Sequence, residues 1–215
     1  MPKTIAKPDA ALFPDADEAF AQALAAVRAC RLCAADLPLG PRPVVHIKPE
    51  ARLLILSQAP GTAVHETGLS FNYRSGDRLR EWLGITREEF YGNPRLGIMG
   101  MGFCYPGVDA NGGDKPPMKI CAPTWHPQLR PLMPKVELSL LVGHYAQVYY
   151  LGDRRKETMT ATVRAWREYM PKFLALPHPS WRNIAWLRKN PWFEADILPA
   201  LRREVRRLLG KTRGA

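Results

Sequence analysis

Four short apolar runs, separated by segments of helical character, are the feature that most constrains the fold of this chain. The runs lie at 53–56, 96–103, 137–143 and 173–176. Each is a nearly continuous apolar stretch, as expected of a strand that is buried on both faces. Strands that alternate with helices build a parallel sheet covered by helices. We therefore predict an α/β fold, a three-layer α/β/α sandwich around a central, mainly parallel four-stranded sheet.

The segments around these runs carry helix signals. Thr86 with Glu89 three residues later predicts a capping box that opens a short helix. The polar stretch after the first strand is predicted to stay irregular until residue 77. We expect a loose arm at 1–17, a single domain at 18–210 and a tail at 211–215. The predicted helices cover residues 19–28, 77–83, 86–91, 126–134, 144–150, 159–169 and 193–209.

The charge balance indicates the class of partner. Lys and Arg number 31 against 20 Asp and Glu, which gives a formal net charge of +11. Such an excess suits a polyanion, with nucleic acid as the leading candidate, although part of it lies in a run at 202–211 typical of one solvated helix face. No apolar run approaches membrane-spanning length. We expect a cytoplasmic protein with no membrane association and no obligate protein partner.

Four cysteines are placed as two remote pairs. Cys30 and Cys33 form a C-x2-C pair, and Cys104 and Cys121 form a distant second pair. Four thiolates from two chain segments can close a tetrahedral site, either for structural zinc or for a [4Fe-4S] cluster. Spacing alone does not separate these two groups. A redox pair is a third reading, but no strand precedes Cys30 as such a site requires, and four unrelated buried cysteines are a fourth.

Two polar loops follow predicted strands and carry the groups that a nucleobase pocket needs. Gln58, Phe71 and Asn72 follow the first strand, and His178 and Ser180 follow the last. Open α/β sheets bind ligands outside the carboxyl ends of their strands. An aromatic plate, amides and an imidazole can stack on a base and bond its edge.

The motifs in these loops resemble those of the uracil-DNA glycosylase superfamily. The first motif is Gln58-Ala59-Pro60-Gly61 with Gly68-Leu69-Ser70-Phe71 and Ser75-Gly76, and the second is His178-Pro179-Ser180. Together with the four cysteines, they are most similar to the iron–sulfur members typified by thermophile enzymes. The resemblance implies a DNA repair hydrolase that cleaves the N-glycosidic bond of a flipped-out damaged base, uracil or another deaminated base, and leaves an abasic site. It also implies a [4Fe-4S] cluster on the four cysteines.

The resemblance assigns roles to individual residues. His178 would stabilise the departing base, as an oxyanion hole stabilises developing charge. Phe71 would stack on that base, and Gln58 would line the pocket. The segment 181–192 would insert into the duplex. The remaining expected contacts are Ala59, Gly61 and Asn72 with the base, and Ser180, Arg182, Asn183 and Lys189 with DNA.

Two positions depart from the family pattern. Ala59 stands where well-known members carry a water-orienting aspartate, and Gln58 stands where the iron–sulfur members carry a glutamate. Glu66 is the nearest substitute on this loop. The segment 99–102 lacks the asparagine that reads uracil, so Asn72 or a backbone group would replace it. The preferred base could then be a deaminated purine or an oxidised pyrimidine.

Two other function classes remain open from the sequence. The missing acids would suit a catalytically impaired family member that only binds nucleic acid. A zinc-stabilised enzyme acting on free nucleosides is the third reading.

Overall fold

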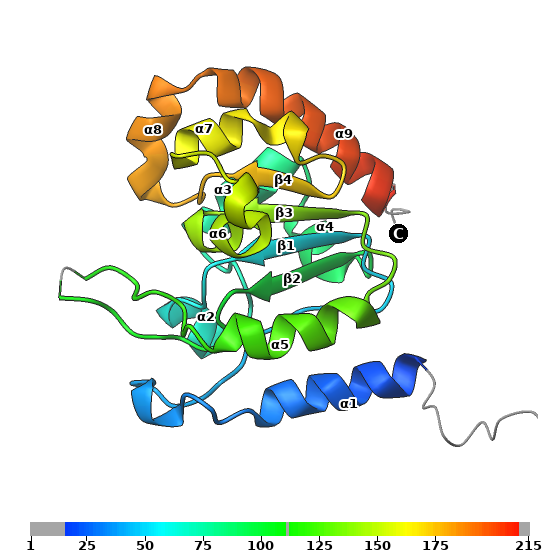
Figure 1. The fold of residues 1–215 in the computed structure, drawn as a ribbon, viewed down its shortest axis with the longest axis vertical. Helices are drawn as coiled ribbons and strands as arrows, with labels where there is room; N and C mark the ends of the chain where they lie inside the picture. Colours follow the sequence, from blue (N-terminus) through cyan, green and yellow to red (C-terminus); the bar gives the residue numbers. More distant parts are fainter. Residues whose placement is uncertain (1–15, 111, 211–215) are drawn as a thin grey trace, which may run out of the picture.

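A computed structural model describes residues 16–110 and 112–210, and it contains one four-stranded parallel sheet (Figure 1). The strands follow the order β2-β1-β3-β4, and every neighbouring pair is parallel. Their bounds are β1 Leu53–Ser57, β2 Leu96–Gly100, β3 Leu138–Val142 and β4 Phe173–Leu176. The predicted α/β fold is thereby confirmed. Most of the predicted arm and the whole predicted tail lie outside the described residues.

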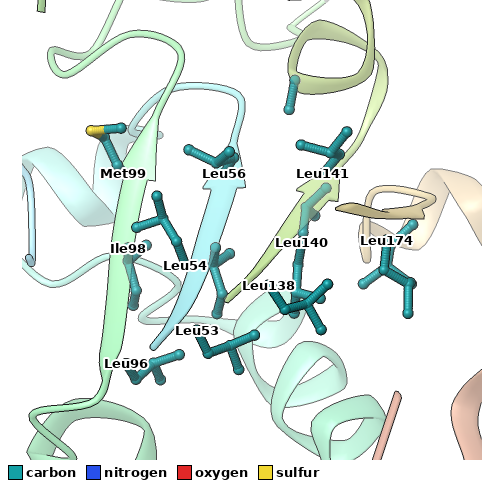
Figure 2. Close-up of a cluster of buried hydrophobic side chains, with 14 of the residues drawn as sticks. Leu53, Leu54, Leu56, Leu96, Ile98, Met99, Leu138, Leu140, Leu141 and Leu174 are labelled. Carbon is teal, nitrogen blue, oxygen red and sulfur yellow. The ribbon is translucent and has the colours of Figure 1, made fainter. Parts of the chain in front are cut away.

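The strands are buried because aliphatic side chains cover both of their faces (Figure 2). Leu53 pairs in register with Leu96 of β2 on one side and with Leu138 of β3 on the other. All of the first four residues of β1 are fully buried. Each such side chain contributes about 1.5–3 kcal/mol on burial, so the sheet is the stable frame on which the loops are mounted.

Helices lie on both faces of this sheet (Figure 1). On one face the Tyr149 hydroxyl of α6 donates to the Ala122 carbonyl of α5 at 3.4 Å. On the other face Trp82 of α3 packs edge-on against Phe193, which lies just before α9, with 4.9 Å between the two ring centroids. The helices are α1 Ala16–Ala29, α2 Thr62–Thr67, α3 Arg74–Leu83, α4 Arg87–Gly92, α5 Cys121–Leu129, α6 His144–Leu151, α7 Met159–Arg164, α8 Ile184–Lys189 and α9 Leu198–Leu209.

Several predicted boundaries were wrong. The stretch before residue 77 is not irregular throughout, because α2 lies within it and α3 already begins at Arg74. The second strand ends at Gly100 rather than at 103, because the Gly102 amide turns away to donate to the Gln58 carbonyl at 2.9 Å. The helix predicted at 126–134 begins earlier, at Cys121.

Two local predictions are confirmed. Thr86 and Glu89 form both hydrogen bonds of the capping box at the start of α4. The basic run near the end of the chain forms one face of α9. Leu201, Val205 and Leu208 of that helix are buried, while Arg203 and Arg206 are exposed.

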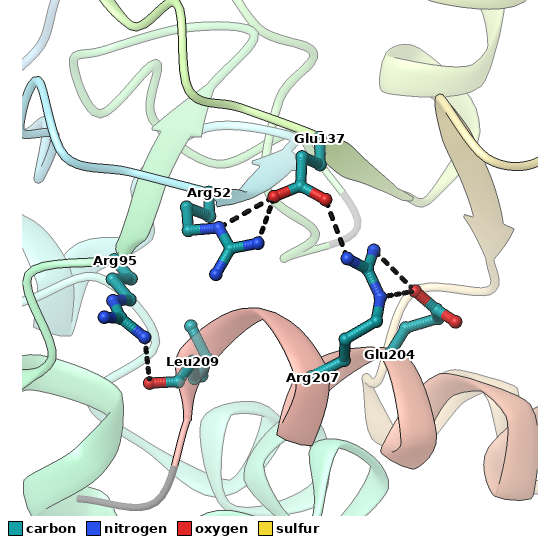
Figure 3. Close-up of polar contacts among 6 residues, drawn as sticks. All are labelled: Arg52, Arg95, Glu137, Glu204, Arg207 and Leu209. Carbon is teal, nitrogen blue, oxygen red and sulfur yellow. Dashed lines mark hydrogen bonds and ion pairs between the residues drawn. The ribbon is translucent and has the colours of Figure 1, made fainter.

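A network of ion pairs ties α9 to the amino ends of the strands (Figure 3). Glu137, just before β3, pairs with Arg52 and with Arg207, the latter at 2.7 Å. Arg207 first and then Arg52 lower the pKa of Glu137 below its usual value. These groups are partly exposed, so each pair contributes little by itself. The network lies at the edge of the sheet opposite to the two polar loops.

Within the described ranges, no helix has the length and apolar character needed to cross a membrane.

Candidate active site

All four strands end at the same edge of the sheet, and the residues that follow them either line one site or contact a residue that lines it. Gln58 follows β1, Gly102 follows β2, Gly143 follows β3 and His178 follows β4. The chain runs from β1 outward to β2 and then returns past β1 to β3. This reversal opens a crevice at the carboxyl ends of the strands, where α/β proteins bind their ligands.

A small pocket lies in this crevice. Gln58, Phe71 and His178 all line it, so the structure brings together residues from both predicted motifs. Ser75, a residue of the first motif to which sequence analysis assigned no role, also lines it; its buried hydroxyl has no hydrogen-bond partner among the described residues. The remaining lining residues are Val44, Ser57, Ala59, Pro60, Gly61, Val64, Ser70, Tyr73, Gly100 and Gly102.

Phe71 is held in an unusual backbone conformation. Its φ angle is +59°, which a residue with a bulky side chain rarely adopts. The buried Arg80 donates to the Phe71 carbonyl at 3.3 Å. Gly76 approaches the same carbonyl so closely that a Cβ there would lie 1.7 Å from its oxygen. The first turn of α3 therefore fixes the aromatic wall of the pocket.

Gly76→Ala is expected to destabilise the fold and the pocket together. The added methyl would overlap backbone atoms, so Phe71 and α3 must separate at a cost of about 3 kcal/mol. Urea unfolding would measure this loss. Gly92→Ala is the matched control, because nothing lies within 4 Å of a Cβ at Gly92. Equal stability of the two variants would contradict the close packing of Phe71.

His178 is positioned by its neighbours at the carboxyl edge. The Asn183 side-chain amide donates to the His178 carbonyl at 2.6 Å. A Cβ on Gly143 would lie 3.3 Å from the His178 Cβ, so the end of β3 supports the imidazole from below. Burial lowers the pKa of His178 to about 4. The side chain is therefore neutral at pH 7 and offers one N–H donor.

A fully buried histidine, His126, supports the floor of the pocket. His126 Nε2 lies 2.9 Å from the Gly100 carbonyl oxygen, and Nδ1 lies 2.6 Å from the Tyr150 hydroxyl. Because a carbonyl only accepts, Nε2 carries the proton and Nδ1 accepts from Tyr150. A Cβ on Gly100 would lie 2.5 Å from the Gly102 carbonyl oxygen. No amide side chain can therefore stand at this floor position.

His126 makes the fold sensitive to acid. Burial lowers the pKa of His126 from 6.5 to about 4, so between these values the unfolded chain binds more protons. Stability should rise with pH across this window. At about 1.4 kcal/mol per pKa unit, protonation linked to His126 alone should lower the free energy of unfolding at pH 4 by about 3 kcal/mol relative to pH 7. Urea unfolding between pH 4 and 7 would test this, and His126→Phe should make the profile shallower, with His178 still contributing to the remaining slope. An unchanged slope in that variant would contradict the assignment.

The pocket opens into a larger groove that carries positive charge. Gln58, Tyr73, Ser75 and His178 line both cavities. Arg78 donates to the Pro179 and Ser180 carbonyls at 3.3 and 3.1 Å, which ties α3 to the second motif. The groove is lined further by Arg74, Arg78, Gly112, Asp114, Tyr145, Pro179, Ser180, Trp181, Arg182, Asn183 and Ile184.

Three predicted site residues do not line the pocket or the groove. Glu66 is exposed on α2. Asn72 accepts from Arg87 at 2.5 Å through its side-chain oxygen. Lys189 is exposed at the end of α8. Sequence reasoning missed Arg78, which follows the first motif on a helix without a distinctive pattern, and Asp114, which lies far along the chain from both motifs.

The four cysteines are brought to one place. They line a single, mostly apolar pocket with Phe103, Met118 and Trp125. The Phe103 amide lies 3.4 Å from the Cys121 sulfur. Burial first, and then the neighbouring thiols, raise the pKa of Cys121 to about 12. No three His, Cys, Asp or Glu side chains in the described part of the chain form a group that could hold a metal ion.

Comparison with known protein families gives a match for this chain. The family model of the Uracil DNA glycosylase superfamily matches residues 44–202. This span is more than half of the chain and contains all four strands and both motifs, whereas Cys30 and Cys33 precede it. The membership predicted from the motifs is confirmed, and the iron–sulfur subtype stays a prediction. The chain belongs to the uracil DNA glycosylase superfamily, which suggests a glycosylase-type hydrolase.

Proposed function

We propose that this protein hydrolyses the N-glycosidic bond of a damaged base flipped out of DNA, uracil or another deaminated base, and leaves an abasic site. The observation that carries the proposal is the meeting of Phe71 and His178 in one pocket beneath a basic groove. An aromatic wall and a neutral N–H donor suit a nucleobase.

The groove would bind the DNA backbone. Arg74 and Arg182 are exposed along it and can contact phosphates. Trp181 is 72% exposed at its rim, and the Arg182 guanidinium lies 5.4 Å from its ring centroid. An exposed aromatic group at this position could enter the base stack and fill the space that the flipped base leaves.

The pocket would then stabilise the departing base. As the glycosidic bond breaks, its electrons move to the base and negative charge develops on the base oxygens. The His178 N–H would donate to such an oxygen, and Phe71 would hold the ring by stacking. Since Gly100 leaves no room for an amide, Ser75 or a backbone group would read the base edge.

An excision assay tests this function. Oligonucleotides, single- and double-stranded, would each contain one uracil, one deaminated purine or one oxidised pyrimidine, and alkali would cut at any abasic site. We expect cleavage of at least one altered base and none of normal DNA. Salt-sensitive DNA binding without excision would instead support a non-catalytic nucleic-acid-binding protein. Hydrolysis of free nucleosides alone would support the alternative of an enzyme that acts on free nucleosides.

We also propose that the four cysteines hold a [4Fe-4S] cluster with a structural role. A four-iron cluster is wider than one ion, so its thiolates stand further apart than zinc ligands do. This suits four cysteines that line one pocket. The Phe103 amide beside the Cys121 sulfur, and the Arg42 amide beside the Cys104 sulfur, would stabilise thiolates.

A further inference from the structure

The first motif lacks the acid that would orient a water molecule, yet one carboxylate reaches the same place from elsewhere. Asp114 lies on a hairpin that follows β2, where Val108 and Asp114 form an antiparallel bridge. A Cβ placed on Gly61 would lie 3.7 and 3.8 Å from the two Asp114 carboxylate oxygens and 3.5 Å from the Tyr73 hydroxyl. From this geometry we propose that Asp114 is the catalytic residue that orients and deprotonates the hydrolytic water. This inference rests on the proposed glycosylase function.

The position of Asp114 suits that role. Gln58, Tyr73 and His178 line both the base pocket and the groove, so they mark the mouth between the two. A base in the pocket would leave its sugar at this mouth. Asp114 lines the groove there, and it is the one carboxylate among the described residues lining either cavity.

The Asp114 side chain makes no hydrogen bond or ion pair that would stabilise the described part of the fold. No described residue forms a hydrogen bond or an ion pair within 4 Å with its carboxylate. The hairpin is held instead by its backbone and by Asp109, whose side chain accepts from the Gly113 amide at 2.9 Å. The Asp114 carboxylate is therefore free to bind a water molecule.

The surroundings of Asp114 tune its basicity. Partial burial first, and then Asp109, raise the pKa of Asp114 above its usual value, while Arg182 opposes this shift. The Tyr73 hydroxyl approaches the same position beside Gly61. The raised pKa makes the ionised carboxylate a stronger base than that of an ordinary aspartate. Glu66, by contrast, is exposed on α2 away from both cavities.

The reaction balances with water as the only co-reactant. The water oxygen bonds to the anomeric carbon as the bond from that carbon to the base nitrogen breaks. The electron pair of the broken bond leaves with the base. Asp114 takes one proton from the water, and that proton then passes to the departed base, directly or through solvent. The products are the free base and an abasic sugar.

Asp114→Asn tests the proposal in the excision assay, with a substrate that the unchanged protein cleaves. The variant should excise at least about 100-fold more slowly, because general-base catalysis contributes about 10²–10⁴-fold. Its DNA affinity and melting temperature should stay close to those of the unchanged protein. Asp153→Asn, the same change at an exposed site outside both cavities, should leave the rate unaltered.

Two further readouts separate catalysis from support of the fold. The acid limb of the pH–rate profile should disappear in Asp114→Asn, and added formate should partly restore the rate of Asp114→Ala. An Asp114→Asn rate within about threefold of the unchanged protein, or a large loss in Glu66→Gln alone, would overturn the proposal. If the unchanged protein excises no base at all, the proposed function itself fails, which is a distinguishable result.

Discussion

His178→Ala should lower the excision rate by about 10²–10³-fold, because removal of one preorganised donor to a developing oxyanion costs about 2.7–4 kcal/mol. The imidazole lines the base pocket and is neutral at pH 7, since burial lowers its pKa to about 4. Its N–H can therefore stabilise the departing base without a change of protonation. Single-turnover excision on the preferred substrate would measure the loss.

His144→Ala is the matched control for this variant. His144 is exposed at the start of α6 and lines neither the pocket nor the groove. Its removal should leave excision unchanged, and both variants should keep the salt-dependent affinity for DNA. Because His178 titrates near pH 4, the rate should show no inflection from this residue near pH 6.5. Full activity in His178→Ala would refute its assigned role.

Replacing Cys104 by serine should remove the proposed cluster and destabilise the protein by more than about 4 kcal/mol, as loss of a structural metal group commonly does. Cys104 and Cys121 bracket the segment that carries Asp114, and Gly102 of the base pocket lies two residues before Cys104. Loss of the cluster should therefore loosen both the pocket floor and the hairpin. Iron and sulfide content and urea unfolding, with protein purified without air, would measure these effects.

Met118→Leu serves as the control, because Met118 lines the same pocket but the leucine that replaces it conserves volume. We expect a change below about 1.5 kcal/mol and full iron content. Zinc in place of iron would support the single-ion alternative. Purified protein without any metal, and with unchanged stability in Cys104→Ser, would contradict the metal site altogether.

Sequence alone determined the frame of this protein and the identity of its two motifs. Aliphatic runs such as Leu53–Leu56 that alternate with helical segments indicate a parallel sheet covered by helices, so the fold class follows from local pattern. Parallel strands also end at one edge, so the strand order along the sequence is enough to predict that the Gln58 and His178 loops lie together. The capping box at Thr86 is equally local and equally predictable.

Tertiary structure alone decided which polar side chains face the pocket. Glu66 is adjacent to the first motif in sequence, but α2, too short to give a clear periodic signal, leaves it exposed to solvent. Asn72 is engaged by Arg87. Asp114, far along the chain, reaches Gly61 because the hairpin after β2 folds back over the first motif. Such contacts join residues remote in sequence, so no local pattern encodes them, and only packing of the whole chain brings them together.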